Sequence, residues 1–493
     1  MTEPLITSRT DWSEELIEKT WRHVEAIAKD VLEVDSTVDC YPNQFEIVSA
    51  EQMLDAYSSI GLPVNYNHWS FGKDFLRNYA AYQRGHMGLA LEMVINTQPC
   101  INYLMEDNDM LAQAMVIAHA GIGHNAVFKN NDYFKQWTDA TSIIDYMVFA
   151  KEYVRRCEER YGTDEVEAVI DAAHCLASHG VDKFKRKHRP KISEEQHLKN
   201  LIEEDDRRQR ELDIVIKKTT IEQVEPDTSA SYDDPEKEEN LLYYIMKKSP
   251  SLEQWKREIL RIVYKINSYF YPQGGTKVLN EGYATFCHFH IMKEMEERGI
   301  ISPDAYISFL HLHSSVIYQP TYNSPHWSGI NPYALGFAIF QDLKRICEEP
   351  TDEDREWFPQ LIGRRWQEVT KEAAFGYRDD SFIAQFLSPK VIRDLGMFSV
   401  EIRPNEDEGY AIGTVTEIHD DEGYKNIRNK LSQYYERVNF VPQIEVIGSD
   451  LEGDRTLYLQ YIPFRERELD RDDAELVVQA IDYLWGYKVH LKD

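Results

Sequence analysis

The stretch "VIAHAGIGHNAVF" (residues 116–128) places two histidines, His119 and His124, in an otherwise apolar run with Gly121 and Gly123 between them. On a regular α-helix, residues five apart point about 140° away from each other, whereas two ligands of one metal ion must share a face. A single π-helical turn between the histidines would bring their imidazoles together. The stretch therefore predicts either a bulged helix that holds a metal ion or two core or capping histidines.

A second stretch, "KVLNEGYATFCHFHIM" (277–292), carries Glu281 and His288 seven residues apart. That spacing brings the two side chains to within about 20° of each other on a helix. A glutamate in an apolar helix is seldom buried without a partner. The small residues Ala284 and Thr285 beside this pair leave room for something in front of it. The pair either faces such a group or is hydrogen-bonded within itself or to the backbone.

The two stretches together resemble a pair of metallopeptidase motifs. "LNEGYATF" is similar to the motif by which many gluzincin aminopeptidases supply their third zinc ligand, and "VIAHAGIGHN" resembles a distorted H-E-x-x-H helix. This resemblance implies that His119, His124 and Glu281 hold a divalent ion, zinc first, with manganese or iron as alternatives. Ala120 stands where the gluzincins place their general base. Another residue must therefore activate water, or peptide hydrolysis is absent.

Two residues are candidates for catalysis beside such an ion. Glu92 lies in "LALEMVIN", an apolar setting that raises the pKa of a carboxyl group unless a cation faces it, and it is the candidate acid/base group. His288 is the second catalytic candidate. His174 and His179 repeat the spacing of five; they either join this site, form another one, or include at least one structural histidine.

Composition limits the compartment and the partners. The 493 residues carry 85 acidic and 55 basic side chains, a formal net charge of -30 that disfavours nucleic acids and anionic lipids as partners. No apolar run reaches the roughly 18–20 residues of a membrane helix, and the N-terminus lacks a secretion signal. The six cysteines form no C-x-x-C pair. We therefore expect a cytoplasmic, reduced protein without a membrane span.

The pattern along the chain predicts a mainly α fold. Helical periodicity is clearest at 12–33, 108–128, 142–160 and 249–270. On a further helix after Pro303, His311 and His313 would point about 200° apart, so they cannot both face one site. "NPYALGFAIF" (331–340), with Gly336 among apolar residues, predicts close helix packing.

The last hundred residues alternate in a strand-like way, with helical patterns between and after them, and predict a small α+β domain of order β-β-α-β-β-α. We expect four regions. They are an N-terminal helical part of the main domain (1–190), a charged insertion or linker (191–240), a second helical part of the main domain (241–396) and the C-terminal α+β domain (397–493).

Several long strings, among them "NHWSFGK" (67–73), "GLALEMVINTQPC" (88–100) and "DDSFIAQFLSPKVIRDL" (379–395), resemble the stage V sporulation protein R family (SpoVR/YcgB). The likeness runs from about residue 10 to beyond 395. It implies a link to spore-cortex formation, although the family also occurs in bacteria that never sporulate. It also implies a PrkA-type serine kinase and a YeaH-type protein as partners. The family brings no settled reaction.

Three functional hypotheses follow. The first is a metal-dependent, zincin-like hydrolase of peptide or amide bonds, in which the main domain has a zincin-like core and the substrate is cell-wall or spore-cortex material or its precursors. The second is a non-catalytic partner in a kinase-linked stress or sporulation pathway, which Ala120 and the charged insertion favour. The third is a redox enzyme with iron held by histidine and glutamate. No P-loop, dinucleotide fingerprint or G-x-S-x-G elbow is present, which disfavours phosphoryl transfer, hydride transfer and α/β-hydrolase chemistry.

Overall fold

The computed structural model describes residues 3–59, 61–84, 86, 91–181, 202, 240–321, 324–397, 400–405, 410–415, 420–436, 443–463 and 470–492. The chain forms two compact units, which are described one by one. Unit 1 comprises Met1–Gly61, Phe75–Thr141 and Pro272–Phe440; unit 2 comprises Leu62–Asp74, Ser142–Tyr271 and Val441–Asp493. The predicted insertion at 191–240 lies outside the described residues except for positions 202 and 240.

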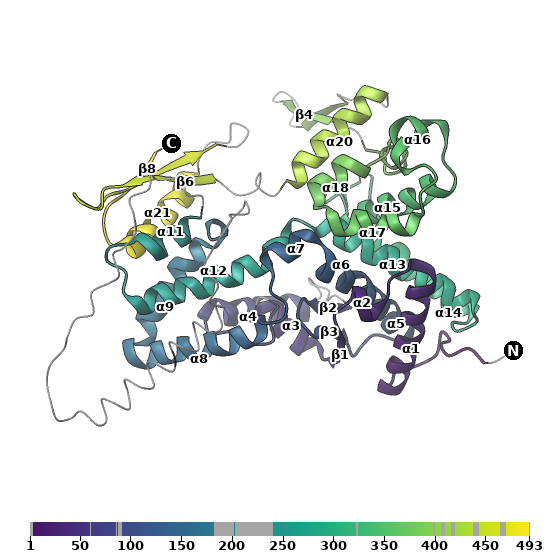
Figure 1. The fold of residues 1–493 in the computed structure, drawn as a ribbon, viewed down its shortest axis with the longest axis horizontal. Helices are drawn as coiled ribbons and strands as arrows, with labels where there is room; N and C mark the ends of the chain where they lie inside the picture. The colour runs from purple at the N-terminus through teal and green to yellow at the C-terminus, as the bar shows by residue number, and fades with distance from the viewer. Residues whose placement is uncertain are drawn as a thin grey trace. The chain divides into compact units, whose positions relative to one another are not determined.

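Unit 1 is helical, as the periodicity predicts, and is built around helix α13 (Figure 1). Because α13 is apolar around most of its circumference, it is buried on nearly all sides by α5, α14, α15 and a π-helical segment. Its helices are α1 (Glu14–Ile27), α2 (Ser36–Asp39), α3 (Ala50–Ser58), α5 (Met110–Ala118), α6 (Asn125–Asn130), α7 (Asp132–Trp137), α13 (Lys277–Glu297), α14 (Pro303–Val316), α15 (Pro332–Glu348), α16 (Asp352–Trp357), α17 (Trp366–Gly376), α18 (Asp379–Phe386), α19 (Pro389–Asp394) and α20 (Asp421–Tyr435).

Unit 1 also contains a small sheet near its N-terminus, which the sequence patterns do not predict. Its strands are β1 (Asn43–Val48), β2 (Glu92–Ile95) and β3 (Cys100–Met105), in the order β1-β3-β2. β1 is parallel to β3, and β2 is antiparallel to β3. Glu92 is therefore the first residue of an edge strand.

Unit 2 combines helices with a second three-stranded sheet. Its helices include α8 (Ile143–Tyr161), α9 (Thr163–Cys175) and α11 (Leu241–Lys248). Two further helices, α4 (Trp69–Gln83) and α12 (Gln254–Gly274), each have residues in both units. The sheet has the order β6-β7-β8, from β6 (Gln443–Ser449), β7 (Leu457–Ile462) and β8 (Val489–Lys492). Helix α21 (Arg471–Trp485) connects the parallel strands β7 and β8, as parallel pairing requires.

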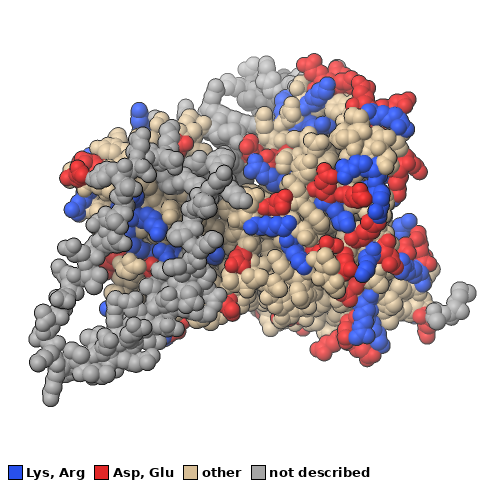
Figure 2. Space-filling model, viewed as in Figure 1, with Lys and Arg blue, Asp and Glu red and all other residues tan. Residues whose placement is uncertain are grey.

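The C-terminal region has the predicted mixture of strands and helices. Strands β4 (Val400–Asn405) and β5 (Tyr410–Val415) form an antiparallel hairpin that precedes α20 in the chain, and β6, β7 and α21 follow in the predicted order. The fold class is thus the predicted one, mainly α with a C-terminal α+β part. None of the described helices is both long and apolar enough to cross a membrane. On the face shown in Figure 2, the described acidic and basic side chains are interspersed rather than gathered by sign.

Glycines allow the backbones of unit 1 to approach closely around α13. A Cβ on Gly336 of α15 would overlap Val278 O, and one on Gly282 would lie 2.5 Å from the carbonyl carbon of Gly336. A Cβ on Gly123 would lie 2.7 Å from Ala284 Cβ. The predicted close packing at Gly336 is confirmed. The π-helical segment, α13 and α15 are therefore held together at backbone distance.

The N-terminus of α13 is capped by a residue from a distant part of the chain. The backbone N–H groups of Val278 and Leu279 donate to the two carboxyl oxygens of Asp379, at 3.0 and 2.8 Å. Burial raises the pKa of Asp379 to about 7, against the opposing effect of these backbone donors. Asp379 thus ties α18 to the helix that carries Glu281.

Replacing Gly336 with alanine should destabilise unit 1. The new methyl group forces α13 and α15 apart, at an expected cost of about 1–3 kcal/mol. Gly72→Ala is the matched control, because that helical glycine has nothing within 4 Å of its Cβ position; it should leave stability unchanged or raise it by up to about 1 kcal/mol. Urea unfolding midpoints measure both. Equal midpoints for the two variants would contradict the packing described here.

Asp379→Asn should change the pH dependence of stability. Because the pKa of Asp379 is raised to about 7 in the folded state, the native chain binds more protons than the unfolded chain between about pH 4 and pH 7, and stability falls as pH rises through that window. Asparagine cannot ionise. The unfolding midpoint of the variant should therefore improve relative to wild type between pH 4 and pH 8.

Asp354→Asn provides the control for this measurement. Although burial opposes it, hydrogen bonds from Arg345 and Thr351 lower the pKa of Asp354 to about 2, so its difference from wild type should stay constant above about pH 5. A constant difference for Asp379→Asn as well would show that Asp379 is ionised throughout.

Candidate metal centre

The helix that carries both histidines contains the predicted bulge. Helix α5 continues without a break into the π-helical residues His119–His124, here called the π-segment, and then into α6. The i→i+5 hydrogen bonding of a π-turn brings residues five apart onto one side of the helix. The ring centroids of His119 and His124 are accordingly 4.6 Å apart. The spacing of five is thereby converted into a shared face.

The N-terminal sheet supports the π-segment. Asn43 of β1 donates from Nδ2 to Gly121 O at 3.0 Å, so this carbonyl of the π-segment has a partner. The Oδ1 atom of Asn43 accepts hydrogen bonds from Asn102 and Asn125, both at 2.9 Å. A side chain at Gly121 would lie 2.8 Å from the ring of Trp21. This polar network and this close contact fix the π-segment against the sheet.

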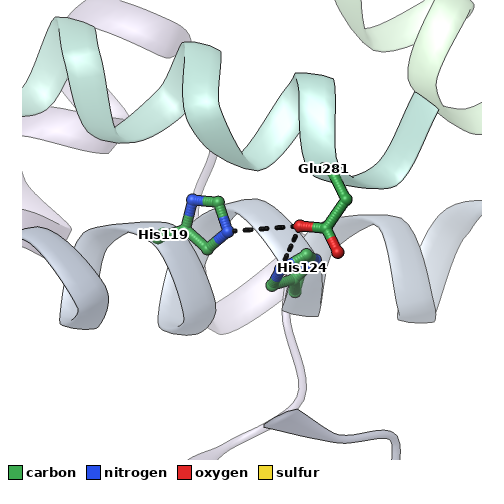
Figure 3. Close-up of side chains that lie close together, drawn as sticks. All are labelled: His119, His124 and Glu281. Carbon is green, nitrogen blue, oxygen red and sulfur yellow. Dashed lines mark ion pairs between the residues drawn. The ribbon is translucent and has the colours of Figure 1, made fainter. Parts of the chain in front are cut away.

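Three side-chain atoms converge in front of the π-segment (Figure 3). Glu281 Oε2, from α13, lies 3.6 Å from His119 Nε2 and 3.4 Å from His124 Nε2. A tetrahedral ion with bonds of 2.0–2.1 Å has edges of about 3.3 Å between its ligand atoms. Among the described residues, this is the single group of three His, Cys, Asp or Glu side chains placed closely enough to hold a metal ion. The two distances from Glu281 Oε2 are close to that length, and all three atoms lie within 4.8 Å of one another, so the group is suited to a divalent ion.

The hydrogen bonding of the three residues also suits a cation. The second ring nitrogen of His124, Nδ1, lies 2.9 Å from Asn280 Oδ1, which can only accept, so a neutral His124 directs a lone pair at Glu281. His119 Nε2 and Glu281 Oε2 are buried, and within the described chain neither has a hydrogen-bond partner. Unpaired buried groups of this kind cost about 1–3 kcal/mol each, more if charged. A cation between them removes that cost.

Electrostatics separates the two carboxylates of the site. Although burial opposes it, the two histidines lower the pKa of Glu281, so its carboxylate is ionised. Burial raises the pKa of Glu92, and the histidines offset this only in part. Glu92 Oε1 lies 3.8 Å from His119 Nε2, on the edge strand β2. One carboxylate is thus suited to hold a cation, and the other has a raised pKa, as a proton-exchanging group needs.

His288 contacts the ring nitrogen of His119 that does not face Glu281. Its Nδ1 is 3.0 Å from His119 Nδ1, and its Nε2 is 2.9 Å from His313 Nδ1. His313 is buried whereas its neighbour His311 is exposed, so the two do not face one site, as their spacing predicts. His174 belongs to unit 2, where its Nε2 is 2.6 Å from Tyr66 Oη.

The sequence analysis did not assign three neighbouring residues to the site. Asn280 orients His124, His313 continues the line of histidines, and the ring of Tyr333 stacks on His119 with centroids 6.2 Å apart. Asn280 directly precedes Glu281 in "LNEGYATF", which was the available signal for it. Tyr333 and His313 carried no such signal, since only the packing of α14 and α15 brings them near.

Asn43→Leu should destabilise the π-segment. Removing the amide leaves Gly121 O, Asn102 and Asn125 short of hydrogen-bond partners, at an expected cost of about 3 kcal/mol in total. The adjacent Gln44 has an exposed side chain, and Gln44→Leu should stay within about 0.5 kcal/mol of wild type. Unfolding midpoints compare the two variants. An unchanged midpoint for Asn43→Leu would rule out a supporting role for this amide.

Comparison with known proteins assigns the chain to a family. The family model described as "SpoVR like protein" matches residues 11–440, and the "SpoVR-like C-terminal domain" matches residues 442–493. The chain is 46% identical over 483 residues to the "Uncharacterized protein YcgB" of Escherichia coli (strain K12), a match that covers 98% of this chain and 92% of that protein. No solved structure matches the chain. The protein belongs to the SpoVR family, as its strings of sequence suggest.

Proposed function

We propose that this SpoVR-family chain is a metal-dependent hydrolase of zincin-like character. His119, His124 and Glu281 bind one divalent ion, zinc first, with manganese or iron as alternatives. The observation that carries the proposal is the convergence of three donor atoms: Glu281 Oε2 lies 3.6 Å from His119 Nε2 and 3.4 Å from His124 Nε2, and all three lie within 4.8 Å of one another. Two of them, His119 Nε2 and Glu281 Oε2, are buried without a hydrogen-bond partner among the described residues. Two nitrogens and one oxygen are a donor set that zinc accepts, and they leave a fourth position open for water or substrate.

Glu92 supplies the proton transfer in this proposal. A bound divalent ion polarises a carbonyl group and lowers the pKa of water. Glu92 accepts the proton of the attacking water and delivers it to the leaving amine. Its raised pKa brings the carboxyl group closer to the operating pH, where such exchange is most efficient. Glu92 would thereby do what Ala120 cannot.

Peptide or amide bonds are the proposed substrates. The family's association with the spore cortex points to cell-wall material or its precursors. The PrkA-type kinase and the YeaH-type protein would then be regulatory or assembly partners of the enzyme rather than its substrates. A purely non-catalytic partner remains the competing interpretation, and it predicts that the three donors hold no ion.

The donor set also favours a second candidate function. Two histidines and one carboxylate on one face of a site are the ligands of non-haem iron(II) oxygenases. His119, His124 and Glu281 have this composition. With iron bound, the chain would be a redox enzyme, and Glu92 would not be needed as the acid/base group. The identity of the metal therefore separates the two candidates.

Elemental analysis of the protein purified without a metal-affinity tag tests the proposal. Wild type should hold about one zinc ion per chain, and His124→Ala and Glu281→Gln should lose it, because each removes one of three ligands. Glu92→Gln should retain the ion yet lose hydrolysis of cell-wall stem peptides or an unfolded protein. His174→Ala is the control, since this half-buried histidine lies outside the site.

Each outcome discriminates. Iron with a visible or paramagnetic signal selects the redox candidate. A folded wild type that holds no metal and takes up none on reconstitution selects the non-catalytic partner. Full metal content in Glu281→Gln overturns the ligand assignment.

A further inference from the structure

Three histidines from three helical segments form a continuous line. His119 Nδ1 of the π-segment meets His288 Nδ1 of α13 at 3.0 Å, and His288 Nε2 meets His313 Nδ1 of α14 at 2.9 Å. All three rings are buried, with 1–4% of each residue exposed. Each interior nitrogen of the line therefore has an imidazole as its partner.

Aromatic side chains surround the far end of this line. The His313 ring centroid lies 4.9 Å from those of Phe289 and Phe337 and 5.7 Å from that of Phe309. Within the described residues, the His288 ring makes hydrogen bonds to His119 and His313 and to no other group. Among the described residues, neither His288 nor His313 has a carboxylate partner that would hold a second proton on its ring. The line is an insulated chain of neutral imidazoles.

A neutral imidazole carries one N–H donor and one lone pair, so the chain has two possible orders. In one order, each Nδ1–H or Nε2–H points away from the metal centre: His119 donates to His288, and His288 donates to His313. In the other order every bond is reversed, and His119 Nε2 carries a hydrogen towards Glu281. A cation on His119 Nε2 requires the lone pair there, and thereby permits the first order alone.

We propose that His288 and His313 are positioning residues of the metal centre, which orient the His119 ring and hold its hydrogen on Nδ1. This inference rests on the proposed binding of a divalent ion by His119. It goes beyond the ligand set because the bound ion would also decide which ring nitrogen carries the hydrogen in His288 of α13 and in His313 of α14. The acceptor for His124 Nδ1–H is the amide oxygen of Asn280. The acceptor for His119 Nδ1–H is His288, which in turn needs His313 as its own acceptor.

Paired substitutions separate hydrogen bonding from space filling. His288→Asn keeps an oxygen near the position of Nδ1 that can accept from His119, whereas His288→Phe keeps the volume and removes the acceptor. Zinc affinity should fall about 10–100-fold in His288→Phe, the usual effect of losing such a partner, and far less in His288→Asn. A role in packing alone predicts the reverse ranking. Competition with a chromophoric chelator measures the affinities.

The same logic applies one step further away. His313→Asn retains an acceptor for His288 Nε2–H, whereas His313→Phe does not, so the phenylalanine variant should bind zinc more weakly than the asparagine variant. This pair also keeps the proposal testable where a substitution at the fully enclosed position 288 prevents folding. Circular dichroism of each metal-free variant establishes that it is folded.

Nitrogen-15 NMR of histidine-labelled protein gives a readout independent of affinity. Zinc should fix the hydrogen of His313 on Nε2 in wild type, although His313 does not touch the ion, and this response should vanish in His288→Phe. If wild type binds no zinc, the proposed function itself fails before any variant is compared. If wild type binds zinc but the asparagine and phenylalanine variants bind it equally and His313 does not respond, the positioning role alone is overturned.

Discussion

The close approach of the π-segment to α13 is the constraint on which the rest of the site depends. Gly123 lies so near Ala284 that a Cβ would overlap its backbone, and this contact sets the distance at which both imidazoles face Glu281. Regular α-helical geometry would turn the two rings about 140° apart, and a wider separation would carry Glu281 out of reach. The π-turn therefore brings both imidazoles to one side of the helix, and Gly123 allows that side to approach α13 closely enough for Glu281 to reach them.

That arrangement points the lone pairs of the two Nε2 atoms and of the Glu281 carboxylate at one another in a buried region. His119 Nε2 and Glu281 Oε2 are buried, and no described side chain donates a hydrogen bond to them. Without a cation, protons must take its place, which is why the charge of Glu281, working against burial, raises the pKa of His124. His288 and Asn280 occupy the second nitrogen, Nδ1, of His119 and His124 respectively. The fold thus holds the donors in place before any ion arrives.

Much of this arrangement follows from local sequence, and the remainder depends on contacts between distant segments. The five-residue spacing with two glycines offers the π-turn as one of two alternatives. Helix spacing predicts that Glu281 and His288 share a face and that His311 and His313 do not face one site. Other expectations failed on packing. Ala284 is small because the backbone of Gly123 occupies the space beside it, not because a ligand does. The short strands around Glu92 lack the alternation that marks a half-buried strand, so the sheet was missed. The metal ligands and catalytic residues themselves stay predictions.

The position of Glu92 is consistent with the acid/base role proposed for it, although position 120 on the helix of the histidines is an alanine. Ala120 is fully buried, so a glutamate there would sit in the core without water to exchange protons. Glu92 instead comes from the edge strand β2, where 17% of its side chain remains exposed, and it still lies within 3.8 Å of His119. Separating the proton-transfer group from the ligand helix lets each carboxylate keep its own environment and its own pKa. The packing around the π-turn thus leaves no room for a solvated carboxylate at position 120, and the proposed acid/base role of Glu92 depends on the position of β2.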